Sequence, residues 1–354
     1  MDIIINKLPV KTFNRLGMNE TEVVDIPEFS GGLMSVSVPE GVLFERQPSQ
    51  PEAKGTGLGE DFEKIVSKLG AENCVLKTEP GVSQKSPVMV KISSYDENSI
   101  YSLSVNAGKG SSVTVIMDYA PSERGGAENG GRMFGVKTSV EAEEGSSVCL
   151  VQLLRHDCGV SCLNDISAVI GGGAKLNIIQ VVLGGRKNYL GCRLSLTGDG
   201  GQASADIGYL TDKGSSLDMN YNAVHTGKNT GSDINVSGVL KDGAFKLFRG
   251  TIDFQGGASG SKGNVKEDVL LLDDNAVNQT IPLILCAEED VEGNHGATVG
   301  ELDEELVLYM QSRGFDRQQV YEEMLRARIN AVCSMIPDAG TRQLMEEYTA
   351  HQTV

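Results

Sequence analysis

The sequence predicts a mainly β protein in which a strand-rich central part is followed by a short helical unit. Short β-favouring runs recur through the centre, each introduced by glycine, and the hydrophobic period changes from two to about 3.6 near Leu302. The chain has 43 glycines among 354 residues, about 12% against a usual share of about 7%, and it has no tryptophan. Such a chain turns often and packs mainly aliphatic side chains.

Residues 1–100 are expected to form an N-terminal mixed region. One helix is predicted from Glu60 to Leu69, and Gly70 is expected to end it. The stretch from Gln47 to Gly59 is rich in proline, glycine and polar residues and predicts a mobile linker.

Residues 101–300 are expected to form the β core. Glycine-led runs begin at Gly110, Gly145, Gly173, Gly201, Gly214 and Gly243. Apolar residues alternate within most of these runs, as in the two series Val113, Val115, Met117 and Leu176, Ile178, Gln180, Val182. This period of two predicts strands with one buried face, and the glycines suit turns that need positive φ.

The spacing of these runs predicts how the strands are arranged. Three of the spacings are 28 or 29 residues, and two others are 35 and 13. A loose repeat of this size favours a β-solenoid, in which each turn buries its apolar face against its neighbours. From the pattern alone, a β-sandwich remains an equal alternative.

Residues 301–354 are expected to form a helical domain. A first apolar stripe comprises Leu306, Tyr309, Met310 and Arg313, and Gly314 ends it. Asp316 and Gln319 form a capping pair for a second helix, whose apolar face is predicted to comprise Val320, Met324, Ala327 and Ala331. A third helix is predicted within Gly340–His351. Such a unit closes the open end of a solenoid or docks a partner.

The net charge and the cysteines indicate which partners and which cellular compartment to expect. The formal charge of −17 repels phosphate backbones, so no nucleic-acid partner is expected. Seven cysteines without a CxxC pair argue against a disulfide framework and for a reducing compartment. The N-terminus lacks the pattern of a signal peptide, and no run of about eighteen apolar residues predicts a membrane span. We therefore expect a cytoplasmic protein.

His295 is the first candidate for chemistry. It follows the acidic residues Glu288, Glu289, Asp290 and Glu292 at the junction of the β core and the helices. A neutral imidazole near carboxylates is a ligand type that suits iron. The alternative is a surface histidine in an acidic loop.

The cysteines supply the other candidates. His156, Cys158 and Cys162 carry the donor types of an Fe–S or zinc site, and strand alternation places His156 and Cys158 on one face. The alternative is that these cysteines are small core residues. Cys286 follows the apolar run Ile281–Leu285 and is expected to be buried. Structural roles are expected for Cys74, Cys149, Cys192 and Cys333.

Motifs for common catalytic chemistry are absent from the sequence. It contains no GxxxxGK[ST] phosphate loop, no GxSxG elbow and no HExxH helix. An exported β-helix enzyme that acts on polysaccharide is a further alternative. The absence of tryptophan and of a signal peptide argues against it.

Three segments resemble the SufB/SufD family of iron–sulfur cluster assembly scaffolds, and the SufD type most closely. They are LPVKTFNRLGMNE (8–20), FRGTIDFQGGASGSKGNVKEDVLLLDD (248–274) and CAEEDVEGNHGATVGELDEELVLYMQSRG (286–314). The resemblance implies a right-handed parallel β-helix with a C-terminal helical domain. It also implies a non-catalytic scaffold subunit of the SUF assembly complex.

The resemblance implies partners as well. The C-terminal helices would bind the SufC ATPase through Leu306, Tyr309, Met310, Val320 and Met324. The last β segment, near Val269–Leu285, would pair with SufB or with a second copy of this chain, and a cysteine desulfurase system would be a further partner.

His295 matches the SufD histidine associated with iron entry at the subunit interface. The resemblance implies no tightly bound cofactor, but transient iron or an Fe–S cluster at this interface. Gly293 stands where the family often has a cysteine, Glu267 stands at the SufB scaffold cysteine, and Gly296 replaces an acidic residue. These departures favour SufD over the alternative, a SufB-like chain that nucleates the cluster itself through Cys286 or through Cys158 and Cys162.

Overall fold

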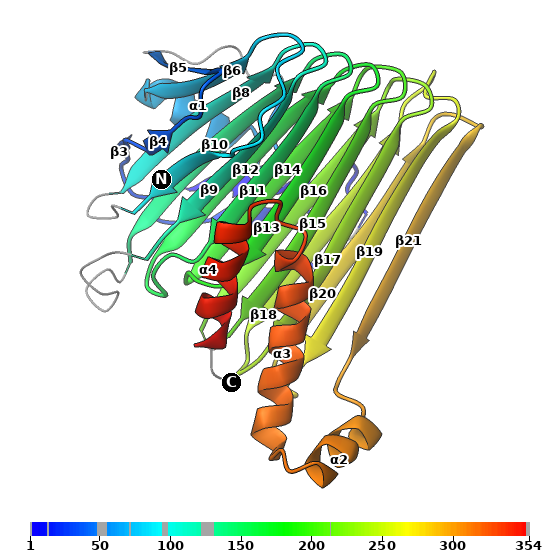
Figure 1. Cartoon of the computed structure of the whole chain (residues 1–354). Helices are drawn as coiled ribbons and strands as arrows, with labels where there is room; N and C mark the ends of the chain where they lie inside the picture. Colours follow the sequence, from blue (N-terminus) through cyan, green and yellow to red (C-terminus); the bar gives the residue numbers. More distant parts are fainter. Residues whose placement is uncertain are drawn as a thin grey trace.

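The computed structural model describes residues 2–12, 14–47, 55–70, 72–93, 98–121, 131–212 and 214–351. This part of the chain forms a parallel β-solenoid with helices on its flank (Figure 1). The ten-stranded sheet comprises β3 (Ser30–Gly31), β5 (Val42–Gln47), β6 (Asn73–Thr78), β8 (Ser99–Ala107), β10 (Met133–Ala142), β12 (Ser161–Ile170), β14 (Lys187–Leu196), β16 (Ser216–His225), β18 (Phe245–Phe254) and β20 (Val277–Cys286). The nine-stranded sheet comprises β4 (Ser35–Ser37), β7 (Val88–Ile92), β9 (Ser112–Tyr119), β11 (Ser147–Leu154), β13 (Lys175–Val182), β15 (Gln202–Thr211), β17 (Gly231–Leu240), β19 (Ser261–Leu271) and β21 (Val291–Gly300).

Each turn of the solenoid places one strand in each sheet, so that strands two apart in sequence pair in parallel. This pairing confirms the solenoid and excludes the β-sandwich. It also explains the irregular spacings. The 13-residue spacing separates β15 from β16, which lie in opposite sheets of one turn. The 35-residue spacing is one full step from β9 to β11, in which Ser112 pairs with Ser147.

The main core lies between the two sheets and is largely aliphatic. As the alternation predicted, Leu176, Ile178 and Val182 point into it. Gln180 also points inward, where its amide donates to the side chain of Gln152 at 2.8 Å, so this polar group is satisfied. The predicted glycine turns are present, with one shift: Gly200, at φ 73°, adopts the left-handed conformation in place of Gly201.

The N-terminal segment lies along the outer face of the ten-stranded sheet. It contains the antiparallel pair β1 (Ile3–Ile5) and β2 (Thr21–Val23) and the helix α1 (Glu60–Leu69). The predicted helix is confirmed, and Gly70 ends it at φ 58°. Residues 48–54 of the predicted linker lie outside the described residues. The end of that stretch is held in place, because the Asp165 carboxylate accepts hydrogen bonds from the backbone of Gly57 and Leu58 at 2.7 and 2.8 Å.

Three helices follow the last strand: α2 (Glu304–Ser312), α3 (Arg317–Cys333) and α4 (Ala339–Ala350). The predicted capping box of Asp316 and Gln319 is present at the start of α3. The predicted buried face of α3 is wrong in part, since Ala327 and Ala331 are exposed. The buried positions of α3 are Val320, Leu325, Ile329, Val332 and Cys333.

The helices cover a flank of the solenoid and leave its last turn open. Side chains of α3 and α4 pack against the outer face of the nine-stranded sheet, chiefly over β13, β15 and β17 (Figure 1). The strand β21 remains exposed along nearly its whole length. The alternative in which these helices close the open end is therefore wrong. Within the described part of the chain, no helix combines the length and the apolar character needed to cross a membrane.

Candidate functional site

The last turn of the solenoid ends in two strands that each have one unpaired edge. Among the residues that the structure describes, β20 pairs only with β18, and β21 pairs only with β19. Each strand is ten residues long, so backbone N–H and C=O groups face outward along it, except at Pro282 of β20, which has no N–H. An unpaired edge of this kind is a template for pairing with another chain.

His295 lies on β21 at this open end. It stands beside Val265 in the parallel ladder, and Val265 points into the core. Because ladder partners in a parallel sheet point to the same face, the His295 side chain points to the interior side of the last turn. No further turn covers that side in the described residues, and His295 is exposed.

The acidic residues that precede His295 do not gather around it. The Glu292 carboxylate binds Lys262 at 3.0 Å on the outer face of the sheet, whereas His295 lies on the inner face. Asp290 accepts a hydrogen bond from Ser259 at 2.7 Å, and Glu288 accepts one from the backbone of Gly257 at 2.9 Å. The described residues contain no group of three or more His, Cys, Asp and Glu side chains placed to hold a metal. Further ligands for a metal on His295 would therefore come from rearrangement or from a partner.

Gly293 lies two residues before His295, and the packing around it explains why glycine suits this position. A Cβ atom there would stand 3.0 Å from Cγ2 of Ile284 and 3.2 Å from a ring carbon of Phe254. A cysteine at this position would require Ile284 to shift. The inner face of β21 thus rests directly on β20 beside His295.

A buried charged cluster lies beneath β21. The Lys246 ammonium of β18 pairs with the Glu267 carboxylate of β19, and their side chains are 0% and 1% exposed. The Thr280 hydroxyl donates to Oε2 of Glu267 at 2.6 Å. Burial lowers the pKa of Lys246, although the charge of Glu267 opposes this shift. Sequence reasoning missed Lys246 and Thr280, although a charge at an inward position of a strand is a recognisable signal.

Cys286 is not buried, contrary to the prediction. It ends β20 with an exposed side chain, and its thiol donates to the Glu288 carbonyl oxygen at 3.0 Å. The apolar run before it includes Ile281, which packs outward against the N-terminal segment, while Cys286 lies at the bare end of the strand. Cys74, Cys192 and Cys333 are buried and Cys149 is half-buried.

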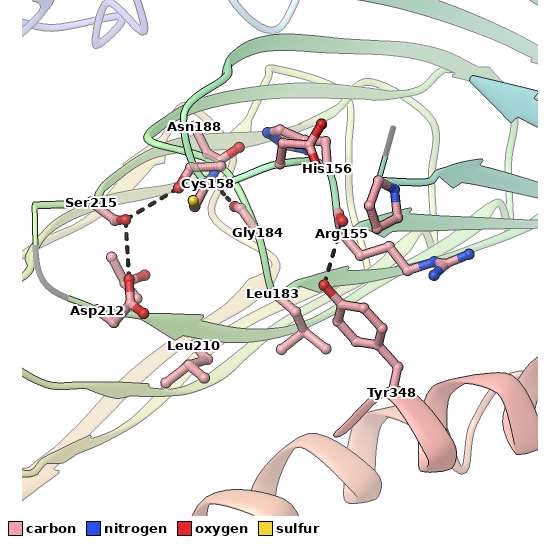
Figure 2. Close-up of a pocket in the computed structure, with 14 residues that line it drawn as sticks. Arg155, His156, Cys158, Leu183, Gly184, Asn188, Leu210, Asp212, Ser215 and Tyr348 are labelled. Atoms are coloured by element: carbon pink, nitrogen blue, oxygen red, sulfur yellow. Dashed lines mark hydrogen bonds between the residues drawn. The ribbon is translucent and has the colours of Figure 1, made fainter. Parts of the chain in front are cut away.

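The trio of His156, Cys158 and Cys162 is divided between two environments. β11 ends at Leu154, so His156 and Cys158 lie in a loop and the predicted strand alternation does not apply. Cys158 lines a cavity of about 250 Å³ between the turn loops and α4 (Figure 2). Cys162 lies inside the solenoid core, where burial raises its pKa. Burial also lowers the pKa of His156 to about 4.

The predicted docking residues of the helical domain differ in exposure. Tyr309 is 55% exposed, and Leu306 and Met310 are half-buried. Val320 is fully buried against the solenoid, and Met324 is half-buried. Sequence reasoning did not single out Leu308, which is 63% exposed, or Phe315, which follows Gly314 and is 38% exposed. Leu308 and Tyr309 of α2, with Phe315 just after it, are thus three of the exposed apolar side chains of the helical domain, and Met335 and Leu344 are two others.

Comparisons with known proteins place this architecture in a family. A family model described as SUF system FeS cluster assembly, SufBD core domain, matches residues 90–327. Similar proteins include iron–sulfur cluster assembly SufBD family proteins of Staphylococcus saprophyticus, Staphylococcus epidermidis and Staphylococcus haemolyticus, each 28% identical over 142 residues. The aligned stretch is 40% of this chain and 30% of each of these relatives.

The family model covers well over half of the chain, including most strands of the solenoid and most of α3. The parallel β-solenoid and the C-terminal helices agree with the architecture that the resemblance implied. The chain therefore belongs to the SufBD family of iron–sulfur cluster assembly proteins.

Proposed function

We propose that this chain is a non-catalytic, SufD-like scaffold subunit of the SUF system. In this proposal its α2 region docks the SufC ATPase, and its open end pairs with SufB or with a second copy of the chain. Iron or a nascent cluster is the cargo held at that interface, and a cysteine desulfurase system supplies the sulfur. The observation that carries the proposal is the exposed His295 on the inner face of an unpaired terminal strand.

The open end suits pairing with another β subunit. β20 and β21 offer unpaired backbone groups over ten residues each, and β20 carries only uncharged side chains. Backbone pairing along such an edge gives affinity, and the side chains along it give specificity. His295 would lie within the resulting interface, where a partner's thiolate or carboxylate could complete the coordination of iron.

The α2 region suits docking of an ATPase. Leu308 and Tyr309 are exposed, and the Arg313 guanidinium stacks over the Tyr309 ring at 5.1 Å from its centre. The neighbouring carboxylates Asp303 and Glu305 favour a partner surface with basic groups, whereas Glu304 is paired with Arg317 at 2.6 Å. The chain itself lacks a phosphate-binding loop, so it depends on a partner for ATP hydrolysis.

The helices provide a physical link between the two surfaces. α3 packs tightly on β13, β15 and β17, so a force applied at α2 acts on the solenoid as a whole. An ATPase pair that closes when it binds nucleotide would thereby shift the equilibrium between two arrangements of the interface at the open end. Such a change would open and close access to His295.

Co-expression of the full chain with SufC and SufB tests the proposal. The double substitution Leu308→Asp/Tyr309→Ala should remove SufC from the purified complex and leave SufB bound. Leu344→Asp, on the exposed side of α4, is the matched control and should retain both partners. His295→Ala should retain both partners and lose most of the iron and sulfide. A His295→Ala complex with unchanged iron and sulfide would contradict the proposed site.

A SufB-like function is the second candidate, because Cys286 is exposed at the same open end as His295. In that case the lone chain would nucleate a cluster on its own thiolates. Anaerobic reconstitution of the purified chain distinguishes the two functions. A stable Fe–S absorption band that Cys286→Ser abolishes supports the SufB-like function, and its absence supports the SufD-like one.

A further inference from the structure

The N-terminal segment crosses the outer face of the ten-stranded sheet toward the open end. The Asn6 side chain donates to the Asp218 carboxylate of β16 at 2.7 Å. Two residues later, Leu8 packs in an apolar cluster with Leu247 of β18 and Ile281 of β20, the last strand of that sheet. The path from residue 6 to residue 8 therefore runs across the strands and reaches the edge of the sheet.

The segment returns along the same route. Met18 belongs to the same apolar cluster as Leu8, and its carbonyl oxygen accepts a hydrogen bond from Nε of Arg249 at 2.7 Å. The Arg249 guanidinium also donates to Asp218 at 2.6 Å and to the Thr21 hydroxyl at 2.9 Å. The Arg249 side chain is fully buried, so these hydrogen bonds are shielded from water. Both the outward and the returning part of the segment are thus fixed to the sheet.

The residues between Leu8 and Met18 lie at the open edge. Leu8 and Met18 are buried over the last strands, whereas the described residues between them, 9–12 and 14–17, are all exposed. We call these exposed residues the N-terminal arm. Both ends of the arm rest over the edge strand β20, and none of its residues is even half-buried. A strand added to β20 would therefore lie next to the arm.

The arm has a defined shape. The Asn19 side chain accepts a hydrogen bond from the Thr12 backbone N–H at 3.1 Å and donates to the Asn14 side chain at 2.8 Å. Gly17 takes the left-handed conformation at φ 64°, which glycine adopts without strain. A loop that is already held in shape loses less conformational entropy when it binds. The arm is thus suited to contact a partner.

The arm combines apolar and basic side chains. Val10 and Leu16 are 44% and 63% exposed. Lys11 and Arg15 are exposed as well, and Lys11 makes only a long contact with Glu20, at 3.9 Å. The arm is therefore locally basic, although the whole chain has a net charge of −17. Charge complementarity favours a partner with acidic groups at this place.

A second copy of this chain fits the arm poorly. If two β20 strands paired around a two-fold axis, both arms would lie on the same face of the joined sheet, and their Lys11 and Arg15 side chains would repel one another. The outer face of the copy at Ile281 would also be covered by its own Leu8. The arm therefore suits a different chain, whose edge strand leaves its outer face free.

We propose that the N-terminal arm binds the outer face of a partner subunit that adds a strand to β20. Val10 and Leu16 pack on apolar side chains of that strand, and Lys11 and Arg15 bind carboxylates beside it. The occupant is an acidic β subunit and not a second copy. The arm lies outside residues 90–327, the part of the chain that matches the SufBD core, so it adds a determinant of partner choice to that core. This inference rests on the proposed function, in which the open end pairs with another β subunit.

The affinity of the full chain for purified SufB tests the inference. The double variant Arg15→Glu/Leu16→Asp should bind at least tenfold more weakly than the unmodified chain, whose own affinity should fall as the salt concentration rises. The matched control is Leu33→Asp/Lys68→Glu, which changes the net charge equally at exposed positions near the first turns. It should bind SufB like the unmodified chain. All of these side chains are exposed, so circular dichroism and the thermal transition should not change.

An arm variant that binds SufB as tightly as the unmodified chain overturns the inference and leaves the pairing of the open end intact. Equal weakening by the two double variants shows a general effect of charge and also overturns it. Sedimentation velocity of the chain alone tests the occupant, and a monomer is expected. Self-association that the arm variant abolishes would identify a second copy as the occupant and contradict the acidic partner. An unmodified chain that does not bind SufB contradicts the proposed function itself and overturns the inference with it.

Discussion

The edge strands at the two ends of the solenoid differ in length, in direction of pairing and in charge. At the N-terminal end, β4 has three residues, β5 has six, and both pair antiparallel with the strand beneath them. β5 also carries charges, with Glu45 bound to Lys77 and Arg46 bound to Glu72. At the C-terminal end, β20 and β21 are ten residues long and continue the parallel ladder to the edge.

This difference bears on which end we propose as the assembly surface. Short edge strands that carry charged side chains are devices that discourage pairing with another chain. The N-terminal end has both of these devices. β20 is ten residues long and its sequence VNQTIPLILC is uncharged, although Pro282 removes one backbone N–H from it. The comparison supports the proposal that a partner completes the C-terminal end.

The largest expected effect comes from a single break in the buried pair near the C-terminal end. Lys246→Met leaves Glu267 buried without its counter-charge, which should cost about 3–5 kcal/mol of unfolding free energy. Urea unfolding followed by circular dichroism measures this loss. Lys77→Met, which breaks an exposed pair at the N-terminal end, is the control and should leave the midpoint unchanged. Equal midpoints for the two variants would remove this contrast between the ends.

The second effect concerns association. Val277 and Val299 are 43% and 46% exposed on the two terminal strands. Changing both to lysine should weaken pairing with SufB or with a second copy at least tenfold, about 1.4 kcal/mol, because charges on an edge oppose strand addition. Sedimentation velocity or a pull-down measures the loss.

Leu43→Lys tests the opposite edge, because Leu43 is 52% exposed on β5. It should leave association unchanged. If Leu43→Lys weakened pairing and the lysines at 277 and 299 did not, the assignment of the two ends would be reversed.

The smallest effect is a pH dependence of stability. His225 is buried, with its ring nitrogens 2.7 Å and 2.8 Å from the hydroxyls of Thr230 and Ser232, and burial lowers its pKa to about 4. The unfolded chain binds a proton near pH 6.5, so it gains protons before the folded chain does. The contribution of His225 to stability is therefore lost as the pH falls from about 6.5 toward 4, by about 1 kcal/mol at pH 5.5. Asp165 acts in the opposite direction, because burial raises its pKa to about 6.

Unfolding titrations of the unmodified chain and of His225→Gln between pH 7 and pH 4.5 measure this contribution, because the difference between the two curves removes the effect of the other titrating groups. His156 contributes in the same direction, since its pKa is also lowered to about 4. No histidine precedes residue 156, so hydrogen exchange at low pH should rise first in the central turns and not at the N-terminal end. A rise that began in β5 and β6 would contradict this account.

Local patterns in the sequence predicted much of the solenoid. Alternation identified the inward series through Leu176, Ile178 and Gln180, and Gly70 and Asp316 marked helix boundaries. The sheet to which each strand belongs did not follow from these patterns, because parallel pairing joins residues about 28 positions apart. The buried face of α3 was predicted only in part, because Ala327 suits both a core and a surface position.

The candidate site was harder to predict, because burial depends on where the stack of turns stops. Cys286 follows an apolar run, yet it is exposed because β20 is the last strand of its sheet. Lys246 is the opposite case, because it is a charged residue and yet the neighbouring turns bury it. Only the three-dimensional register brings Glu267 next to His295.

Hydrogen–deuterium exchange of the full chain, alone and in complex with SufC and SufB, tests the central claim most directly. The account predicts strong new protection of backbone amides in β20 and β21, including the segment around His295, and little change in β4 and β5. Protection confined to other strands, with β20 and β21 exchanging as fast as in the free chain, would contradict the assignment of the open end as the assembly surface.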